Sequence, residues 1–347
     1  MRHLVLLSSL VLLAACQNGR RSEPMTANDA GDLDARVAAV VSCIDAQWVP
    51  VEFKTPSCSY LPPQDGFLPA NEAYAVLWMQ SAYESEAVIS SIYGAAGMQL
   101  DQALAAPGHA LATSELDHPS ERKPPAIIVD IDETIVDNDA FNARGLAKRF
   151  IQFDEGYFDC WGAEQKARGY PAAVRLLRDA EAKGATVFYV TNRRENQRTP
   201  VVETLRREGF PVRADGANVV FRNFGGTNDD GSREKGPRRQ CVASQFRVAM
   251  MFGDNLGDFV DHVHQRPEQR RALATKEGAD SHWGRTWFML PNPVYGSWLA
   301  VMQGFRADGQ TPGSDRERNL ESWADPQLPD AETGTVQESF ESERTPQ

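Results

Sequence analysis

The fold is decided by one stretch of the chain, Ala126-Ile-Ile-Val-Asp-Ile-Asp-Glu-Thr134. Its four apolar residues predict a short buried strand, and the polar residues come where that strand ends. Side chains two apart on a strand share a face, so Asp130 and Asp132 start out pointing the same way. Two carboxylates this close repel each other unless a cation or a shared proton lies between them. The stretch therefore favours a site for a hard divalent cation such as magnesium, which binds oxygen ligands.

This stretch has two other interpretations. A calcium-binding loop would need Asp or Asn near position 134 and glycine near position 135. Thr134 and Ile135 stand there, so the calcium loop is rejected. A solvated acidic turn remains open as the alternative on these residues alone.

Four further apolar runs are predicted strands, at residues 186–190, 218–221, 248–252 and 286–290. Helical stretches lie between them, such as residues 172–183 and 200–208. Continuous apolar strands that alternate with helices predict a parallel sheet covered on both faces. We therefore expect an α/β fold with a doubly wound, Rossmann-like sheet and a small helical accessory domain. Such sheets bind ligands at the carboxyl ends of their strands.

Polar clusters follow these strands. Thr191-Asn192-Arg193 follows the second strand, Lys235 lies in a basic segment, and Asp254 and Asp258 follow the fourth strand. Alone, the Thr191 and Lys235 clusters are more typical of a turn and a solvated surface, whereas the cluster with Asp254 and Asp258 is as typical of a metal site as of a turn. Together they would gather at one edge of the sheet, where a hydroxyl and a lysine suit phosphate and paired carboxylates suit a metal ion.

This combination resembles the haloacid dehalogenase superfamily, and more closely the class C nonspecific acid phosphatases, the surface-lipoprotein 5′-nucleotidase family. The resemblance covers roughly residues 70–300. The stretches that carry it are residues 128–138, 187–193, 253–259 and 288–298. It implies a Mg²⁺-dependent acid phosphatase that hydrolyses phosphomonoesters, above all nucleoside monophosphates, through a phospho-aspartate intermediate.

The resemblance also implies roles for the carboxylates. Asp130 matches the nucleophile and a magnesium ligand. Asp132 matches the general acid and base, and its backbone carbonyl matches a further metal ligand. Asp254 matches the metal-binding carboxylate, and Asp258 matches a neighbouring acid that orients metal-bound water.

The substrate-binding positions follow from the same resemblance. Thr191 and Lys235 match phosphate-binding residues, and Asn192 and Arg193 would shape the rim of the site. Tyr295 matches an aromatic residue that stacks on a nucleotide base. Arg238 is the alternative to Lys235, because the segment before both is rich in glycine. A non-catalytic nucleotide-binding surface lipoprotein and a phosphotransferase remain the alternative functions.

The N-terminus predicts export. Arg2 and His3 precede an apolar run, Leu4 to Leu13, and small residues then lead to Cys16. This is the pattern of a signal peptide over residues 1–15, and the run is too short to span a membrane. Because the sequence before Cys16 looks like a bacterial lipobox, we expect a lipid on Cys16. The protein would then be a membrane-anchored lipoprotein on the periplasmic side of the outer membrane.

Four cysteines remain, and outside the cytoplasm they can pair in three ways. They are Cys43, Cys58, Cys160 and Cys241. Cys43 with Cys58 closes a short loop and is the first candidate pair. Free buried thiols at Cys160 and Cys241 are the alternative.

The rest of the chain divides by composition. Residues 16–69 are expected to be a tether and an irregular segment, and residues 70–120 a helical region with a break at Gly94 and Gly97. Residues 121–305 would be the catalytic domain. Residues 306–347 carry ten acidic and four basic residues and are expected to lack fixed structure. The net charge of −12 argues against a nucleic-acid polymer as a partner.

Overall fold

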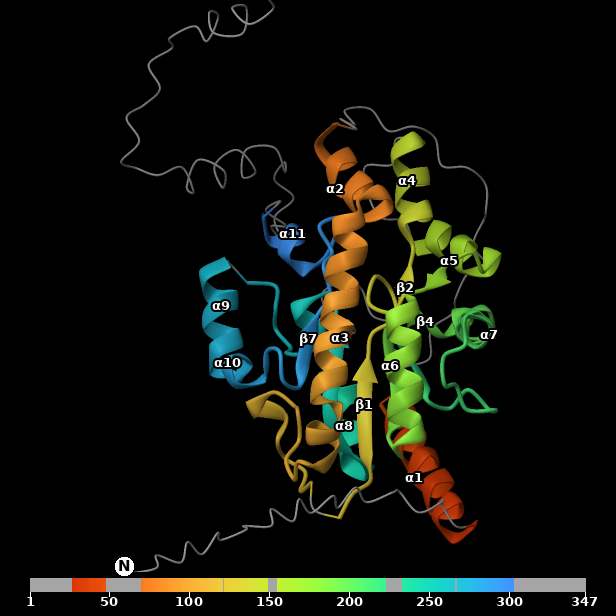
Figure 1. Ribbon diagram of the computed structural model, residues 1–347, viewed down its shortest axis with the longest axis vertical. Coiled ribbons are helices and arrows are strands. Elements are labelled where there is room, and N and C mark those ends of the chain that lie inside the picture. Colours follow the sequence, from red (N-terminus) through yellow and green to blue (C-terminus); the bar gives the residue numbers. More distant parts are fainter. Residues whose placement is uncertain are drawn as a thin grey trace, which may run out of the picture.

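A computed structural model describes residues 27–47, 70–120, 122–148, 155–222, 233–265 and 267–302 (Figure 1). Its centre is a five-stranded sheet in the order β5-β4-β1-β6-β7, in which every neighbouring pair is parallel. The strands are β1 (Pro125–Val129), β4 (Thr186–Arg194), β5 (Val219–Arg222), β6 (Arg247–Gly253) and β7 (Trp287–Met289). All five predicted strands and the doubly wound parallel sheet are confirmed. The strand order reverses direction at β1, so the polar residues after β1 lie at the switch point where such sheets bind ligands.

Alternate residues of the central strand enter two separate cores. Ile127 and Val129 belong to a buried cluster on one face of the sheet, and Ala126 and Ile128 belong to a cluster on the other face. Helices α3 (Tyr83–Ala105), α6 (Pro171–Ala182) and α7 (Arg198–Glu208) supply the first cluster, and α1 (Ala27–Asp45) and α8 (Gly236–Gln245) supply the second. Burial on both faces is the reason that the strands read as continuous apolar runs.

The remaining elements are short. They are α2 (Ala70–Ser81), η1 (Thr113–Glu115), β2 (Val136–Asp137), α4 (Asp139–Ala147), α5 (Glu155–Glu164), β3 (Arg168–Gly169), η2 (Glu195–Gln197), η3 (Leu256–Asp258), α9 (Pro267–Lys276), α10 (Ala279–His282) and α11 (Ser297–Met302). Strands β2 and β3 pair antiparallel, and with α4 and α5 they form a small cap between β1 and β4. In Figure 1 this cap and α2 lie beyond the carboxyl end of β1.

The predicted helix break at Gly94 and Gly97 is wrong. Both glycines lie inside α3, and the break falls at Ala82, between α2 and α3. A buried stripe that includes Tyr93 and Leu100 packs α3 onto the sheet, and this burial outweighs a cost of about 1 kcal/mol per helical glycine. Helix α3, predicted as part of an accessory region, thus covers one face of the sheet.

The predicted irregular segment before residue 69 is wrong for residues 27–45, which form α1. Val37, Val40 and Ile44 are buried in the cluster that also holds α8. A disulfide joins Cys43 to Cys241 of α8, with the two Cα atoms 5.7 Å apart.

This bond also overturns the predicted Cys43–Cys58 pairing. Cys160 is disulfide-bonded as well, so the free-thiol alternative is wrong for both Cys160 and Cys241. Cys58 lies outside the described residues.

Other predictions also fall outside the described residues. They concern the signal peptide, Cys16 and the acidic tail after residue 305. Within the described ranges, no helix combines the length and the apolar character needed to cross a membrane.

Candidate active site

The turn after β1 fixes the first two aspartates. The backbone N–H of Asp130 donates to the carbonyl of Phe252 in β6 at 3.0 Å, so Asp130 still belongs to the sheet. The chain then reverses through Glu133, whose φ of 52° is unusual for a residue with a side chain. The hydroxyl of Tyr93 in α3 donates to the carbonyl of Thr134 at 2.7 Å and anchors the turn.

Three carboxylates converge next to this turn. One oxygen each of Asp130, Asp254 and Asp258 lies within 4.8 Å of the others. Asp254 follows β6 and accepts hydrogen bonds from Nδ2 of Asn292 at 2.7 Å and from Oγ1 of Thr134 at 3.2 Å. We call Asp130, Asp254 and Asp258 the acidic triad. The resemblance implies that Asp258 is a neighbouring acid that orients metal-bound water, and in the structure an oxygen of its carboxylate lies within the triad itself.

A lysine lies against the acidic triad. Nζ of Lys235, the residue before α8, is 2.5 Å from Oδ1 of Asp130 and 2.7 Å from Oδ1 of Asp258. Burial opposes the charge of Lys235, but these two carboxylates raise the pKa of its ammonium above the usual value. The structure therefore brings the predicted phosphate-binding lysine to the predicted nucleophile.

The triad's electrostatics favour a bound cation. Burial raises the pKa of Asp130 from 3.8 to about 7, with Lys235 opposing the rise and Asp258 and Asp132 adding to it. Burial, together with Asp258 and Asp130, also raises the pKa of Asp254 well above its ordinary value. Three buried carboxylates with one ammonium carry excess negative charge. Their oxygen donors are those that hard divalent ions prefer, so the residues fit a metal ion such as magnesium.

Asp132 has a different setting. Its carboxylate is not part of the triad and accepts hydrogen bonds from Nε and Nη2 of Arg193 and from Nδ2 of Asn138. Burial opposes the charge of Arg193, but Asp132 raises the pKa of the guanidinium above its usual value. Arg193, predicted to shape the rim, is instead only 7% exposed and belongs to the site's interior.

Thr191, the other predicted phosphate-binding residue, lies near the carboxyl end of β4. Thr191 is fully buried, and its Oγ1 accepts a hydrogen bond from the backbone N–H of Arg193 at 3.0 Å. Arg238, the alternative to Lys235, donates from Nη1 to the carbonyl of Thr191 and from Nη2 to Oδ1 of Asn192, both at 2.5 Å. Arg238 therefore holds the end of β4 in place, and Lys235 is the cation beside the carboxylates.

The family model for HAD superfamily, subfamily IIIB (Acid phosphatase) matches residues 64–298, more than half of the chain. The chain belongs to this family. The predicted resemblance is confirmed, and membership supports the predicted phosphomonoesterase class. Acid phosphatase 1 of Solanum lycopersicum is 26% identical over 169 residues, which are 48% of this chain and 57% of the tomato protein. The chain thus spans little more than half the length of that relative.

Two solved structures share the fold. The class C acid phosphatase from Bacillus anthracis with tungstate bound superposes with a TM-score of 0.60 at 25% identity, covering 74% of this chain and 97% of the other. A second structure of the class C acid phosphatase from Bacillus anthracis gives 0.59 at 24% identity, with 73% and 96% covered. The HAD-type fold that the motif resemblance implies is therefore shown.

In this HAD subfamily IIIB chain, the loop after β7 carries Tyr295, which is 37% exposed. Oδ1 of Asn292 accepts hydrogen bonds from the backbone N–H groups of Val294 and Tyr295, while Nδ2 of the same residue holds Asp254. An open groove of about 610 Å³ lies between this loop and α2. Its lining includes Trp78, Asn292 and Trp298 but not Tyr295.

Sequence reasoning missed Asn138 and Asn292, the amides that hold the acids of this HAD subfamily IIIB site. Asn292 comes two residues after the end of a predicted strand, and that position was a usable signal. Asn138 lies beyond the turn, and nothing in its spacing points to Asp132.

Proposed function

We propose that this protein is a magnesium-dependent acid phosphatase that hydrolyses phosphomonoesters, preferentially nucleoside monophosphates, through a phospho-aspartate on Asp130. One observation carries the proposal: Lys235 contacts both Asp130 and Asp258 inside a triad of carboxylates at the carboxyl edge of the sheet. A nucleophile, a phosphate-binding cation and metal-binding oxygens are what phosphoryl transfer requires in one place.

The first step breaks the ester bond. A carboxylate oxygen of Asp130 attacks phosphorus while Lys235 and the hydroxyl of Thr191 hold the phosphoryl oxygens. The bond from phosphorus to the ester oxygen breaks, and Asp132 gives its proton to that oxygen. Asp130, Asp254 and the backbone carbonyl of Asp132 would hold magnesium, with Asp258 close enough to join them, and the ion would neutralise charge on the phosphoryl group.

The second step releases phosphate. Asp132, now ionised, takes a proton from water as the water oxygen attacks the phosphorus of the acyl-phosphate. The bond between phosphorus and the Asp130 oxygen breaks, and the enzyme returns to its starting state. The same carboxyl thus serves as acid and then as base.

Two further observations support the substrate class. Tungstate, named with the Bacillus anthracis structure, is a tetrahedral oxyanion like phosphate. Tyr295 is exposed on a loop tied through Asn292 to Asp254, so a flat group attached to the phosphate would be within reach of an aromatic ring.

The test is hydrolysis of p-nitrophenyl phosphate and adenosine 5′-monophosphate with Mg²⁺ and with a chelator. We expect Asp130→Asn to lower kcat by at least about 10³-fold, because it removes the nucleophile. Asp179→Asn, a change on the exposed surface of α6, serves as the matched control and should leave kcat unchanged. Activity that persists after complete metal removal, or in Asp130→Asn, would refute the proposal.

We also propose that the protein is anchored on the periplasmic side of the membrane by lipid on Cys16. The Cys43–Cys241 disulfide supports an oxidising compartment. The Cys16→Ser substitution should move the protein from the membrane fraction to the soluble fraction, as measured by fractionating cells that express the variant. An unchanged distribution would contradict the anchor.

A further inference from the structure

The two oxygens of Asp132 have unequal surroundings. Oδ1 accepts hydrogen bonds from Nδ2 of Asn138 at 2.8 Å, from Nη2 of Arg193 at 2.7 Å and from Nε of Arg193 at 3.1 Å. Oδ2 accepts one contact in the described part of the chain, from that same Nε at 3.0 Å. Three donors fill the accepting capacity of Oδ1, whereas Oδ2 keeps room for a further partner.

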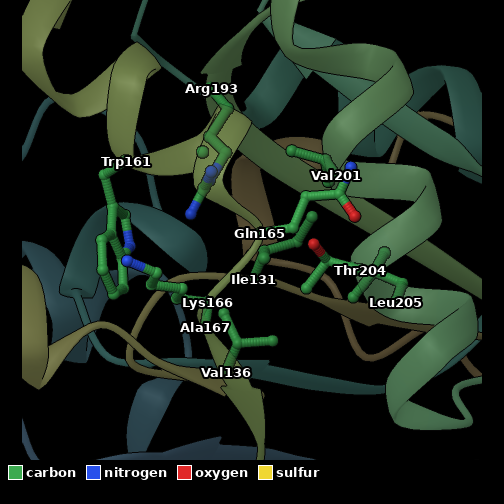
Figure 2. Close-up of a pocket in the computed structure, with 11 residues that line it drawn as sticks. Ile131, Val136, Trp161, Gln165, Lys166, Ala167, Arg193, Val201, Thr204 and Leu205 are labelled. Carbon is green, nitrogen blue, oxygen red and sulfur yellow. The ribbon is translucent and has the colours of Figure 1, made fainter. Parts of the chain in front are cut away.

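The donor groups of Arg193 are held in place. The guanidinium stacks over the ring of Phe158, with its central carbon 4.6 Å from the ring centre. Figure 2 shows Arg193 extending from β4 into the space between Trp161 and Val201. The cavity beside it has about 10 Å³, roughly the room for one water molecule. A Cβ added at Gly162 of α5 would lie 2.9 Å from Nη1 of Arg193, which shows how closely the backbone of α5 approaches the guanidinium.

The amide of Asn138 has one possible orientation. Nε1 of Trp161 donates to Oδ1 of Asn138 at 2.8 Å, and an indole nitrogen can only donate. The oxygen of the amide must therefore face Trp161, and its nitrogen must face Asp132. Arg193, Asn138 and Trp161 thus form one fixed network behind a single carboxylate.

From this geometry we propose that Arg193 and Asn138 are positioning residues that clamp Oδ1 of Asp132 and reserve Oδ2 as the oxygen that transfers the proton. The inference rests on the proposed phosphatase function. In the first step the O–H bond on Oδ2 breaks as its proton passes to the ester oxygen leaving phosphorus. In the second step Oδ2 regains a proton from the attacking water, so protons and electrons balance over the cycle.

The positioning role of Arg193 and Asn138 can be distinguished from a purely structural role by comparing the hydrolysis of esters whose leaving groups differ in basicity. The phenolate that leaves p-nitrophenyl phosphate needs little protonation, whereas the alkoxide that leaves glycerol 3-phosphate needs a proton from the acid. A misplaced Oδ2 should therefore slow the alkyl ester more than the aryl ester.

The main variants are Arg193→Lys, which keeps the charge without the planar fork, and Arg193→Ala. For both we expect kcat on glycerol 3-phosphate to fall by about 10²-fold or more and kcat on p-nitrophenyl phosphate by less than about tenfold. KM should change little for either ester. Added guanidinium chloride at millimolar concentration should restore alkyl-ester turnover in Arg193→Ala.

Two further variants make the test decisive. Arg194→Met removes the neighbouring ion pair with Asp159 without touching Asp132, so it should slow both esters by the same factor. Asn138→Ala removes one donor to Oδ1 without stranding a buried charge. Asn138→Ala should lower kcat on the alkyl ester relative to kcat on the aryl ester, as Arg193→Lys does. If the Arg193 variants do not fold, this ratio in Asn138→Ala tests the inference.

Equal losses on both esters in Arg193→Lys and Asn138→Ala would overturn the inference. That outcome is distinct from failure of the proposed function. In the latter case the unaltered protein would hydrolyse neither ester, or Asp130→Asn would remain active.

Discussion

Replacing Cys43 and Cys241 by alanine together opens a covalent link between residues 198 apart in the chain. In the chain-entropy model, a closed loop of about 200 residues stabilises the folded state by about 5 kcal/mol at 25 °C, because the unlinked chain gains freedom when it unfolds. Losses of native disulfides are typically about 2–5 kcal/mol, and a whole domain is stable by only about 5–15 kcal/mol. We therefore expect the double variant to lose a large share of its free energy of unfolding.

Urea denaturation of the oxidised protein and of the double variant measures this loss. The m-value should rise in the variant, since its unfolded chain expands and exposes more surface. A reductant is not a substitute for mutation, because it would also attack the disulfide of Cys160.

The single variants separate the bond from the packing of the side chains. Cys241 is 1% exposed whereas Cys43 is half-buried, so a packing effect would make Cys241→Ala the more costly of the two. If the bond is responsible, both single variants and the double variant lose about the same stability. A double variant within about 1 kcal/mol of the unaltered protein, with an unchanged m-value, would refute the reasoning.

Two other predictions concern charges in the interior. Burial raises the pKa of Asp130 from 3.8 to about 7. The free energy of unfolding of the metal-free protein should therefore fall as the pH rises from about 4 to about 7, because the folded state resists ionisation of this carboxyl. Magnesium displaces the proton, so its affinity should weaken by up to about tenfold per pH unit below pH 7, as measured by calorimetric titration; an affinity independent of pH would contradict this. Arg239 is fully buried and donates from Nε to Oε2 of Glu115 at 2.9 Å and from Nη2 to Oδ1 of Asp261 at 2.8 Å. Glu115→Ala therefore leaves this buried charge partly stranded, with Asp261 as its remaining carboxylate partner, and should cost less than the about 3–5 kcal/mol of a fully unpaired charge in urea denaturation. Glu115→Ala combined with Arg239→Met should cost less than Glu115→Ala alone, and an equal or greater cost would show that the stranded charge is not the cause.

The strands were predictable because they are apolar runs buried largely on both faces, and because β1, β4 and β6 lead into polar residues. The apolar run ending at Val190 did not show that β4 continues to Arg194, because that extension depends on pairing of Arg194 with Arg222 in β5. The order of the strands in the sheet could likewise not be predicted, because the positions of strands in the sequence do not determine which of them are neighbours.

The candidate site, like the fold, could be predicted only in part. The convergence of Asp130, Asp254 and Lys235 could be predicted because the two aspartates follow strands and because all three match positions of the motif resemblance. The contacts of Arg193 were not, because they depend on α5 packing beside the turn after β1. Helix α1 was missed because its buried stripe of Val37, Val40 and Ile44 is short, and because its partner α8 is some two hundred residues away in the sequence.

The side-chain amide of Asn292 makes two separate sets of hydrogen bonds, and this limits which substitutions the site can accept. Its nitrogen grips Asp254, while its oxygen ties down the backbone that carries Tyr295. Under the proposed function, a substitution here would disturb the affinity for the metal ion and the position of Tyr295 together, because neither half of the amide can turn without releasing the other. On the same proposal, new substrate preferences have an easier route through Tyr295 itself or the walls of the neighbouring groove, where a change leaves the hydrogen bond to Asp254 intact.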